Sequence, residues 1–254
     1  MTEAHAAAAR LAPHERDELT TLLHGADSME LKLTVPDRDQ RSAVRALEMD
    51  PLDAEIRQVF FFDTPDLKLY QHGVIVRARR TARGDDSVVK LRPVVPSEIS
   101  PELRSLKGFG VEVDAMPGSF VCSARMRAKM RVGKVKEAVD GNRSLRSLFD
   151  KKQRAFFAEC VPGIALDDLT ILGPIMVMKL KFSPSGYDGR LVAELWLYPD
   201  GSRILELSTK AETADAFEVA ERTRQFLQQR GVDLTGEQQT KTRSALEFFA
   251  SDLR

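Results

Sequence analysis

The chain has 254 residues, of which 43% are hydrophobic and 30% are charged, a composition typical of ordinary globular proteins. Lysine plus arginine and aspartate plus glutamate each number 38, so the formal net charge is zero. The protein as a whole therefore has no positive electrostatic field that would attract nucleic acid or an anionic membrane. Any anion-binding site must come from a local group of basic residues.

The cysteines and the apolar segments exclude further classes of protein. Cys122 and Cys160 have neither the Cys-x-x-Cys spacing of a zinc site nor the density of a disulfide-rich protein. No apolar run approaches the roughly 20 residues that span a bilayer, and the start shows no apolar segment followed by a cleavage site. We expect a cytoplasmic protein with reduced thiols, in which residues 1–27 form a loosely ordered lead-in.

Segments in which apolar and polar residues alternate, the pattern of strands, follow one another along the chain. In chain order they cover residues 28–35, 58–62, 74–80, 87–93, 110–114, 175–182, 191–198 and 203–208. Helical spacing predicts a helix over 36–47 and two more over 214–230 and 238–249. Residues 63–66, Asp-Thr-Pro-Asp, favour a turn rather than a site.

The stretch between residues 116 and 173 is the least regular part of the chain. Basic residues there interleave with leucine and phenylalanine at broadly helical spacing, so we expect a mainly helical insertion. Phe156 and Phe157 are expected to pack in a core rather than to contact a ligand. His72 lies beside Gly73 in a predicted loop, and we do not expect such a lone loop histidine to be catalytic.

Alternation along the strands also gathers like charges on one side of each strand. The basic pairs are Arg77 with Arg79, Lys90 with Arg92, and Lys179 with Lys181, the acidic pair is Glu112 with Asp114, and Glu30 shares a side with Lys32. A sheet with its polar side in water is one interpretation. Solvated faces usually mix signs, however, because adjacent like charges repel, so the basic pairs favour an interior that holds an anion.

Acidic and basic side chains on one lining are typical of a metal-assisted polyphosphate site. Carboxylates would repel a bare polyphosphate, but they become useful if Mg²⁺ or Mn²⁺ lies between them and the phosphate oxygens. Arginine can hold phosphate oxygens with two hydrogen bonds, and lysine supplies a point charge. The strand faces therefore predict a small polyphosphate as the partner.

Four segments carry a family resemblance: Met29-Glu30-Leu31-Lys32-Leu33, Phe61-Phe62-Asp63-Thr64-Pro65-Asp66-Leu67, Gly73-Val74-Ile75-Val76-Arg77-Ala78-Arg79-Arg80 and Val89-Lys90-Leu91. In this order they resemble the CYTH superfamily, the triphosphate tunnel metalloenzymes, which include inorganic and thiamine triphosphatases and class IV adenylyl cyclases. The resemblance implies an α+β fold over residues 28–254, a closed antiparallel barrel of about eight strands with helices packed outside.

The resemblance also implies site residues. The family's opening Glu-x-Glu-x-Lys motif falls on Ser28, Glu30 and Lys32, so its first carboxylate is missing here. A Glu-x-Glu on the closing strand falls on Glu206 and Ser208, again one carboxylate short. Glu30 and Lys32 are the implied catalytic residues, and Glu30 and Glu206 are implied ligands of Mg²⁺ or Mn²⁺.

Further residues complete the implied site. The candidates to replace the missing metal ligands are Glu112, Asp114, Glu194 and Asp200. The residues that would bind the phosphates are Lys32, Arg77, Arg79, Lys90, Arg92, Lys179 and Lys181. Lys241 and Arg243 are similar to a basic position near the end of the family domain, but on a helix we expect them to be solvated.

Three functions stay open from the sequence. The first is metal-dependent hydrolysis of a triphosphate compound, and the second is an adenylyl cyclase, although no segment identifies an adenine pocket. The third is a polyphosphate-binding module without catalysis, because the loss of two carboxylates weakens binding of a hard divalent cation. We expect no nucleic-acid or membrane partner, and the sequence does not specify an oligomeric state.

Overall fold

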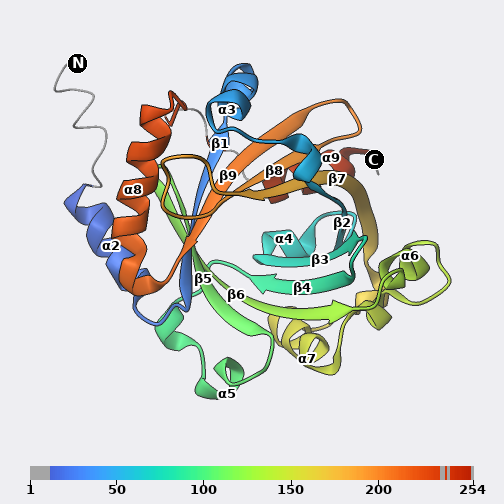
Figure 1. Ribbon diagram of the computed structural model, residues 1–254. Helices are drawn as coiled ribbons and strands as arrows, with labels where there is room; N and C mark the ends of the chain where they lie inside the picture. Colours follow the sequence, from blue (N-terminus) through green and yellow to red (C-terminus); the bar gives the residue numbers. More distant parts are fainter. Residues whose placement is uncertain (1–11, 235–237, 239–240, 253–254) are drawn as a thin grey trace.

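Nine strands close into a barrel in the computed structural model, within the residues that it describes, 12–234, 238 and 241–252 (Figure 1). They are β1 (Ser28–Val35), β2 (Glu55–Asp63), β3 (Val74–Thr81), β4 (Asp85–Leu91), β5 (Phe109–Met116), β6 (Ser119–Met130), β7 (Thr170–Phe182), β8 (Leu191–Leu197) and β9 (Arg203–Ala211). The order around the barrel is β1-β5-β6-β4-β3-β2-β7-β8-β9, and β9 pairs with β1 to complete the circle.

The closed α+β barrel expected from the sequence is confirmed, with two corrections. The expected barrel was wholly antiparallel, whereas β1 and β5 pair in parallel. The ninth strand, β6, occupies residues that we expected to be helical. Alanine, methionine, arginine and lysine in β6 are good helix formers, but pairing with β4 on one side and β5 on the other overrides that preference.

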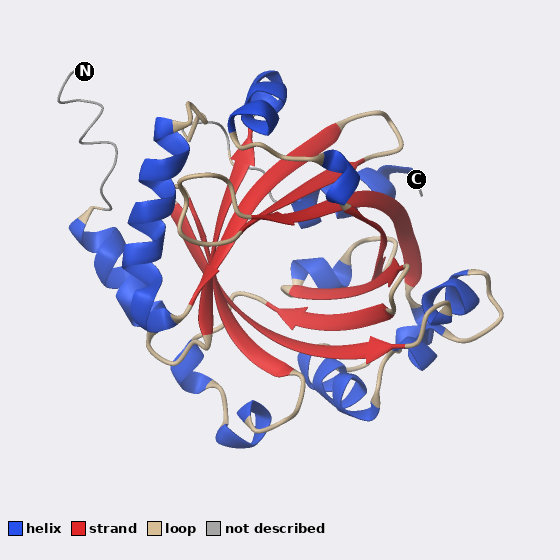
Figure 2. Cartoon of the chain, in the orientation of Figure 1, coloured by secondary structure: helices blue, strands red, loops and turns tan. Residues whose placement is uncertain are grey.

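Helices lie around the barrel (Figure 2). They are α2 (Pro13–Leu23), α3 (Gln40–Ala46), α4 (Lys68–Gln71), α5 (Pro101–Arg104), α6 (Lys134–Val139), α7 (Lys151–Cys160), α8 (Ala216–Gln229) and α9 (Lys241–Asp252), with short 3-10 helices η1 (Asp37–Asp39), η2 (Pro51–Asp53), η3 (Pro96–Glu98), η4 (Leu145–Leu148), η5 (Leu166–Asp168) and η6 (Thr213–Asp215). Among the described residues, no helix is both long and apolar enough to cross a membrane.

The lead-in expected over residues 1–27 contains a helix. Leu19 and Leu23 of α2 are buried in a cluster with Met29 of β1 and Val111 of β5, so α2 packs on the barrel wall. Proline at its first position suits a helix start, where the missing N–H is not needed. The rest of the expected lead-in before residue 12 lies outside the described residues.

Apolar residues pack both outside the barrel and inside one of its ends. Outward-facing residues of β1 and β9 pack against α8, and those of β3 and β4 pack against α7. Phe61 lies beside Arg77 in the register and therefore faces the interior, where it joins a buried cluster with Trp196 and with Ala245 and Leu246 of α9. Helix α9 therefore covers one end of the interior.

The turn expected over residues 63–66 is confirmed and has a structural role. The buried carboxylate of Asp63 accepts hydrogen bonds from the backbone N–H groups of Thr64 at 2.7 Å, Leu69 at 2.9 Å and Tyr70 at 3.0 Å. These bonds satisfy N–H groups at the start of α4, which have no partner within the helix. Asp63 thus holds the connection between β2 and β3.

Candidate functional site

The charged side chains of the strands face the interior of the barrel. Met29 and Leu33, which alternate with the charged residues of β1, are buried in clusters with residues of α2 and α8. Since side chains alternate along a strand, Glu30 and Lys32 must point the other way, into the barrel. The interpretation of a sheet with its polar side in water is therefore wrong.

Three carboxylates lie together between β1 and β5. One oxygen from each of Glu30, Glu112 and Asp114 falls within 4.8 Å of the others. Asp114 accepts hydrogen bonds from the Nζ atoms of Lys32 at 2.7 Å and Lys90 at 2.9 Å. Burial tends to raise the pKa of Asp114, but the two ammonium groups hold that pKa well below its ordinary value. Asp114 is therefore charged at neutral pH.

The two residues predicted to be catalytic are in direct contact. Lys32 Nζ lies 3.2 Å from the Glu30 carboxylate as well as 2.7 Å from Asp114. Burial opposes ionisation of both groups, yet Lys32 lowers the pKa of Glu30, and Asp114 and Glu30 raise the pKa of Lys32 well above its ordinary value. Both side chains thus carry their charges inside the barrel.

A second ion-pair group joins β7, β8, β9 and α9. Glu194 accepts hydrogen bonds from Lys179 Nζ at 2.7 Å and Lys241 Nζ at 2.5 Å, and Lys241 also lies 2.7 Å from Glu206. Burial tends to raise the pKa of Glu194, but the two lysines hold it well below its ordinary value. The same Lys241 ammonium lies 5.1 Å from the ring centroid of Trp196, within cation–π range.

Lys241 was expected to be solvated, and this expectation is wrong. Its side chain is only 13% exposed, because α9 covers one end of the interior and Lys241 is its first residue. Burial tends to lower the pKa of Lys241, but Glu194 and Glu206 raise it. Arg243, two residues further on, is exposed as expected and pairs with Glu247 at 2.8 Å.

A third group lies on β3, β4 and β6. Arg79 donates two hydrogen bonds of 2.9 Å to Asp86, and Arg127 donates a third, of 3.1 Å. Arg77, on the same side of β3, has no ion pair with any residue that the structure describes. Burial and the neighbouring charge of Arg79 lower the pKa of Arg77 to about 10, so Arg77 remains a cation at neutral pH.

Several basic residues that pair with carboxylates of the barrel escaped the sequence analysis, two of them because β6 was expected to be helical. Arg125 of β6 lies 3.8 Å from Glu112, and Arg127 binds Asp86. Lys210 of β9, just beyond the end of the predicted last strand, lies 2.5 Å from Glu112. The signal for β6 was present, because Arg125 and Arg127 alternate with apolar residues in the sequence.

Other candidates do not join these groups. Lys181 is exposed and Arg92 is half-buried, and neither has an ion pair with a described residue. Asp200 does not replace a metal ligand, since its exposed carboxylate accepts a hydrogen bond from the Ser202 backbone at 2.9 Å in a turn. His72 is exposed, and its Nδ1 lies 2.7 Å from a backbone oxygen of α4.

The carboxylate group fits a hard divalent cation. Oxygen donors from Glu30, Glu112 and Asp114 are of the type that Mg²⁺ and Mn²⁺ prefer, and they lie close enough together to share one ion. Ser28 and Ser208, the positions that lack carboxylates, are buried in the same wall, beside Glu112 and Lys32 respectively. Three carboxylates could therefore hold a metal without them, in competition with the lysines that they now contact.

Comparisons with known proteins match the fold rather than the sequence. No protein-family model matches the chain, and no curated protein matches it in sequence. A "putative adenylate cyclase" from Bacillus halodurans has a similar structure, with a TM-score of 0.59 and 12% identity over 86% of this chain and 97% of that chain. The "putative adenylyl cyclase HpAC1" from Hippeastrum, described as having a dominant triphosphatase activity, has a TM-score of 0.58 and 16% identity over 83% and 91%.

At these identities the likeness shows a shared fold. The shared barrel fits the one that the CYTH resemblance implies, and in this chain it contains the three groups of ion pairs.

Proposed function

We propose that this protein binds the triphosphate group of a small molecule inside the barrel and hydrolyses a phosphoanhydride bond with Mg²⁺ or Mn²⁺. The observation that most supports this proposal is Arg77, a half-buried cation beside Arg79 without a carboxylate partner among the described residues. Burying an unpaired charge is costly. A phosphate group between the arginines would supply the missing negative charge and accept several hydrogen bonds.

The cations would bind the phosphates, and the carboxylates would hold the metal. Arg77 and Arg79 would bind the oxygens of one phosphate, while Lys32 and Lys90, which both contact Asp114, would neutralise another. Glu30, Glu112 and Asp114 would hold the metal, which on binding polarises a phosphorus–oxygen bond and neutralises charge that develops on the phosphate. Positioning and charge neutralisation would then account for most of the rate enhancement.

Glu30 is the carboxylate most available for this role. Asp114 has two lysine partners and Glu112 lies near Lys210 and Arg125, whereas Glu30 has only a single ion pair, at 3.2 Å, among the described residues. Its lowered pKa keeps it ionised at neutral pH, as metal binding requires.

The test is a substrate panel of inorganic triphosphate, thiamine triphosphate and ATP, each with Mg²⁺, Mn²⁺ or chelator, in which phosphate, pyrophosphate and cyclic AMP are all measured. We expect metal-dependent release of phosphate. Glu30→Ala should abolish it, and Lys32→Ala should lower kcat by about 100-fold or more, the usual effect of removing one charged group that stabilises a transition state. Glu218→Ala, on the exposed side of α8, is the matched control and should be fully active.

Two results would contradict the proposal. Full activity of either Glu30→Ala or Lys32→Ala would show that the site is elsewhere. Formation of cyclic AMP and pyrophosphate from ATP would identify the adenylyl cyclase reaction instead of hydrolysis.

A binding-only role is the second candidate, and Lys241 is the observation that favours it. Its ammonium group lies between the carboxylates of Glu194 and Glu206, where a cation of the protein's own already balances their charge. With serine at positions 28 and 208, the interior then has fewer free carboxylates for a metal.

The binding-only role is tested with the double variant Ser28→Glu and Ser208→Glu. If the wild type binds triphosphate tightly without metal and does not turn it over, the double variant should acquire metal-dependent hydrolysis. If the double variant only lowers an activity already present in the wild type, the binding-only role is excluded.

A further inference from the structure

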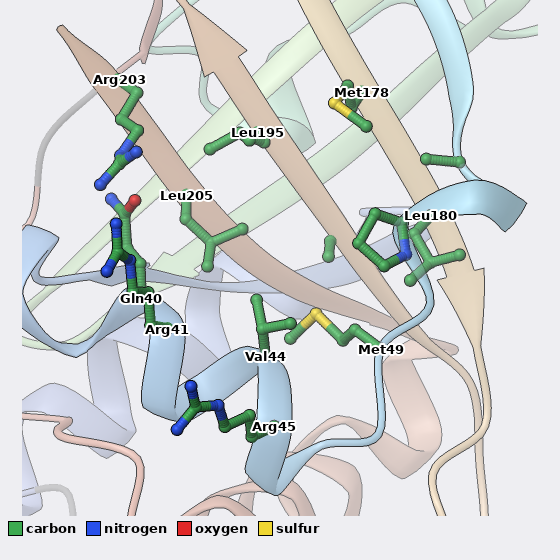
Figure 3. A pocket seen from close by; sticks show the side chains of 13 residues that line it. Gln40, Arg41, Val44, Arg45, Met49, Met178, Leu180, Leu195, Arg203 and Leu205 are labelled. Atoms are coloured by element: carbon green, nitrogen blue, oxygen red, sulfur yellow. The ribbon is translucent and has the colours of Figure 1, made fainter.

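A cavity of about 320 Å³ lies on the outer face of the barrel, on the opposite side of the sheet from the ion pairs (Figure 3). Its floor is formed by Met178 and Leu180 of β7, Leu195 of β8 and Leu205 of β9. These residues alternate with the inward-facing Lys179, Glu194 and Glu206. The sheet therefore separates this cavity from the proposed triphosphate site.

Helix α3 and the segment that follows it form the opposite wall. Val44 of α3 and Met49, which follows this helix, face the floor across the cavity, and Pro51 of η2 also lines it. The cavity is thus a slot between the sheet and the segment that contains α3. Its volume is at the lower end of the range for small-molecule sites, roughly 300–1,000 Å³. A slot with apolar walls on two sides fits a slender apolar chain.

The apolar lining continues onto the surface. Ile56 is 59% exposed and lies beside Met178 in the register of β2 and β7, and Leu52, 92% exposed, follows Pro51. Large apolar side chains with such exposure are few among the described residues. A chain longer than the slot would therefore still contact apolar surface at its exit.

One side of the slot is polar and cationic. Figure 3 shows Gln40, Arg41 and Arg203 on the same side of the cavity. Gln40 is only 6% exposed and lines the slot, and its side-chain amide makes no hydrogen bond with a described residue, so it is available to a bound group. Arg41 likewise has no ion pair among the described residues, and Arg203 pairs only with the exposed Asp37, at 3.2 Å.

We propose that this slot binds a small amphipathic anion, a linear hydrocarbon chain that ends in a carboxylate or phosphate group. The anionic group would accept hydrogen bonds from Gln40 and Arg41 and would form an ion pair with Arg203. The hydrocarbon chain would lie on the apolar floor, formed by Leu205, Leu195, Met178 and Leu180. The partner is identified by charge complementarity at one end of the slot and by apolar contact along the rest. This proposal does not depend on the proposed function of the barrel interior.

The probes are octanoate, decanoate and dodecanoate below their micellar concentrations, with dodecyltrimethylammonium as the probe of opposite charge, and titration calorimetry measures their binding. We expect affinity to rise about fourfold for each added methylene group, the equivalent of about 0.8 kcal/mol. The cationic probe should bind at least about tenfold more weakly than dodecanoate, because the arginines repel it. Equal affinity for the two charges would overturn the proposal.

Variants then locate the binding. Val44→Phe fills the slot from α3 and should abolish dodecanoate binding, and Arg41→Glu, an exposed substitution that the fold should tolerate, should weaken it at least about tenfold. Arg38→Glu, on the neighbouring η1 and outside the slot, is the matched control and should bind as the wild type does. Arg77→Met in the barrel interior should also leave dodecanoate binding unchanged.

Sedimentation of the wild type and of Arg41→Glu without any probe tests the rival occupant, a second copy of the chain. A monomer in both cases, with the probe affinities above, supports the proposal. A wild-type dimer that Arg41→Glu dissociates, or dodecanoate binding that neither Val44→Phe nor Arg41→Glu weakens, would overturn it.

Discussion

Arg77 carries its charge inside the barrel without a carboxylate partner among the described residues, whereas its neighbour Arg79 is held by Asp86. An unpaired cation that is largely removed from water, as the half-buried Arg77 is, destabilises the folded protein. We expect Arg77→Met to raise the free energy of unfolding, measured in urea, while it weakens binding of inorganic triphosphate at least about tenfold, since a charge-assisted hydrogen bond contributes roughly 1.5–3 kcal/mol.

Arg80→Met is the matched control for Arg77→Met. Arg80 lies on the other side of β3 and donates a hydrogen bond of 2.9 Å to Gln58. Its replacement should leave triphosphate binding unchanged. Equal loss of binding in both variants, measured by calorimetry, would show that Arg77 has no special role.

Asp114 gives the protein a predictable response to acid. Its pKa is lower in the folded protein than in the unfolded chain, because Lys32 and Lys90 hold it down against the effect of burial. The stability that it contributes is therefore fully present above the ordinary aspartate pKa of about 3.9 and is lost as the pH falls below that value. We expect the free energy of unfolding to fall less steeply with acidification in Asp114→Asn than in the wild type.

Urea titrations from about pH 7 to about pH 3 measure this difference. At neutral pH the variant should be less stable by about 3 kcal/mol, because both lysines lose a buried partner. Parallel pH profiles of the two proteins would contradict the assignment.

The connection between α4 and β3 depends on a glycine. Gly73 has a φ of +73°, and a Cβ atom there would lie 2.1 Å from the backbone oxygen of Arg92. Gly73→Ala must therefore move the backbone, and we expect it to lower the free energy of unfolding by about 3 kcal/mol or more. Gly118→Ala is the control, because Gly118 has a φ of +75° but nothing within 4 Å, so only the cost of its conformation, about 1–2 kcal/mol, should appear. Similar losses in the two variants would show that the contact with Arg92 is unimportant.

The elements that the sequence predicts well are those in which local pattern and tertiary contacts agree. The predicted bounds of β1 coincide with those in the structure, because its apolar side packs outward and its charged side lines the interior. In β6 apolar and polar residues also alternate, but many of them are good helix formers, which favoured the prediction of a helix. Pairing with β4 and β5 outweighs that preference and makes the segment a strand.

The candidate site was predictable to the extent that it lies on single strands. The charged faces of β1, β3 and β5 followed from alternation, and the contact between Glu30 and Lys32 needs only their spacing. Lys241 could not be found in this way, since its burial depends on how α9 meets β8 and β9. The partners of Asp114 on β1 and β4 likewise depend on the order of strands around the barrel.

For the molecule as a whole, Lys241 connects the last helix to the barrel wall. Glu194 and Glu206 are neighbours across β8 and β9, so without the ammonium group their charges would repel each other inside the barrel. We expect Lys241→Met to lower the free energy of unfolding by about 3 kcal/mol and to speed amide hydrogen exchange throughout α9. Arg243→Met, which removes an exposed pair, should change stability by less than about 0.5 kcal/mol.

Hydrogen exchange followed by mass spectrometry checks this prediction. Slow exchange in α9 of Lys241→Met, at the rate of the wild type, would contradict it, since the apolar contacts of Ala245 and Leu246 would then hold the helix alone.

The pairing of β1 with β9 has a consequence for biosynthesis. Met29 faces Ala211 across this seam, so one edge of the first strand has no partner until most of the chain has left the ribosome. Its parallel contact with β5 forms earlier and covers one edge, but the other edge, flanked by acidic and basic residues, stays open to any strand that meets it. Contacts so distant along the chain form slowly. Closure of this seam is therefore a late step in folding, and until it occurs the open edge is a site for aggregation, which the charged side chains of β1 oppose.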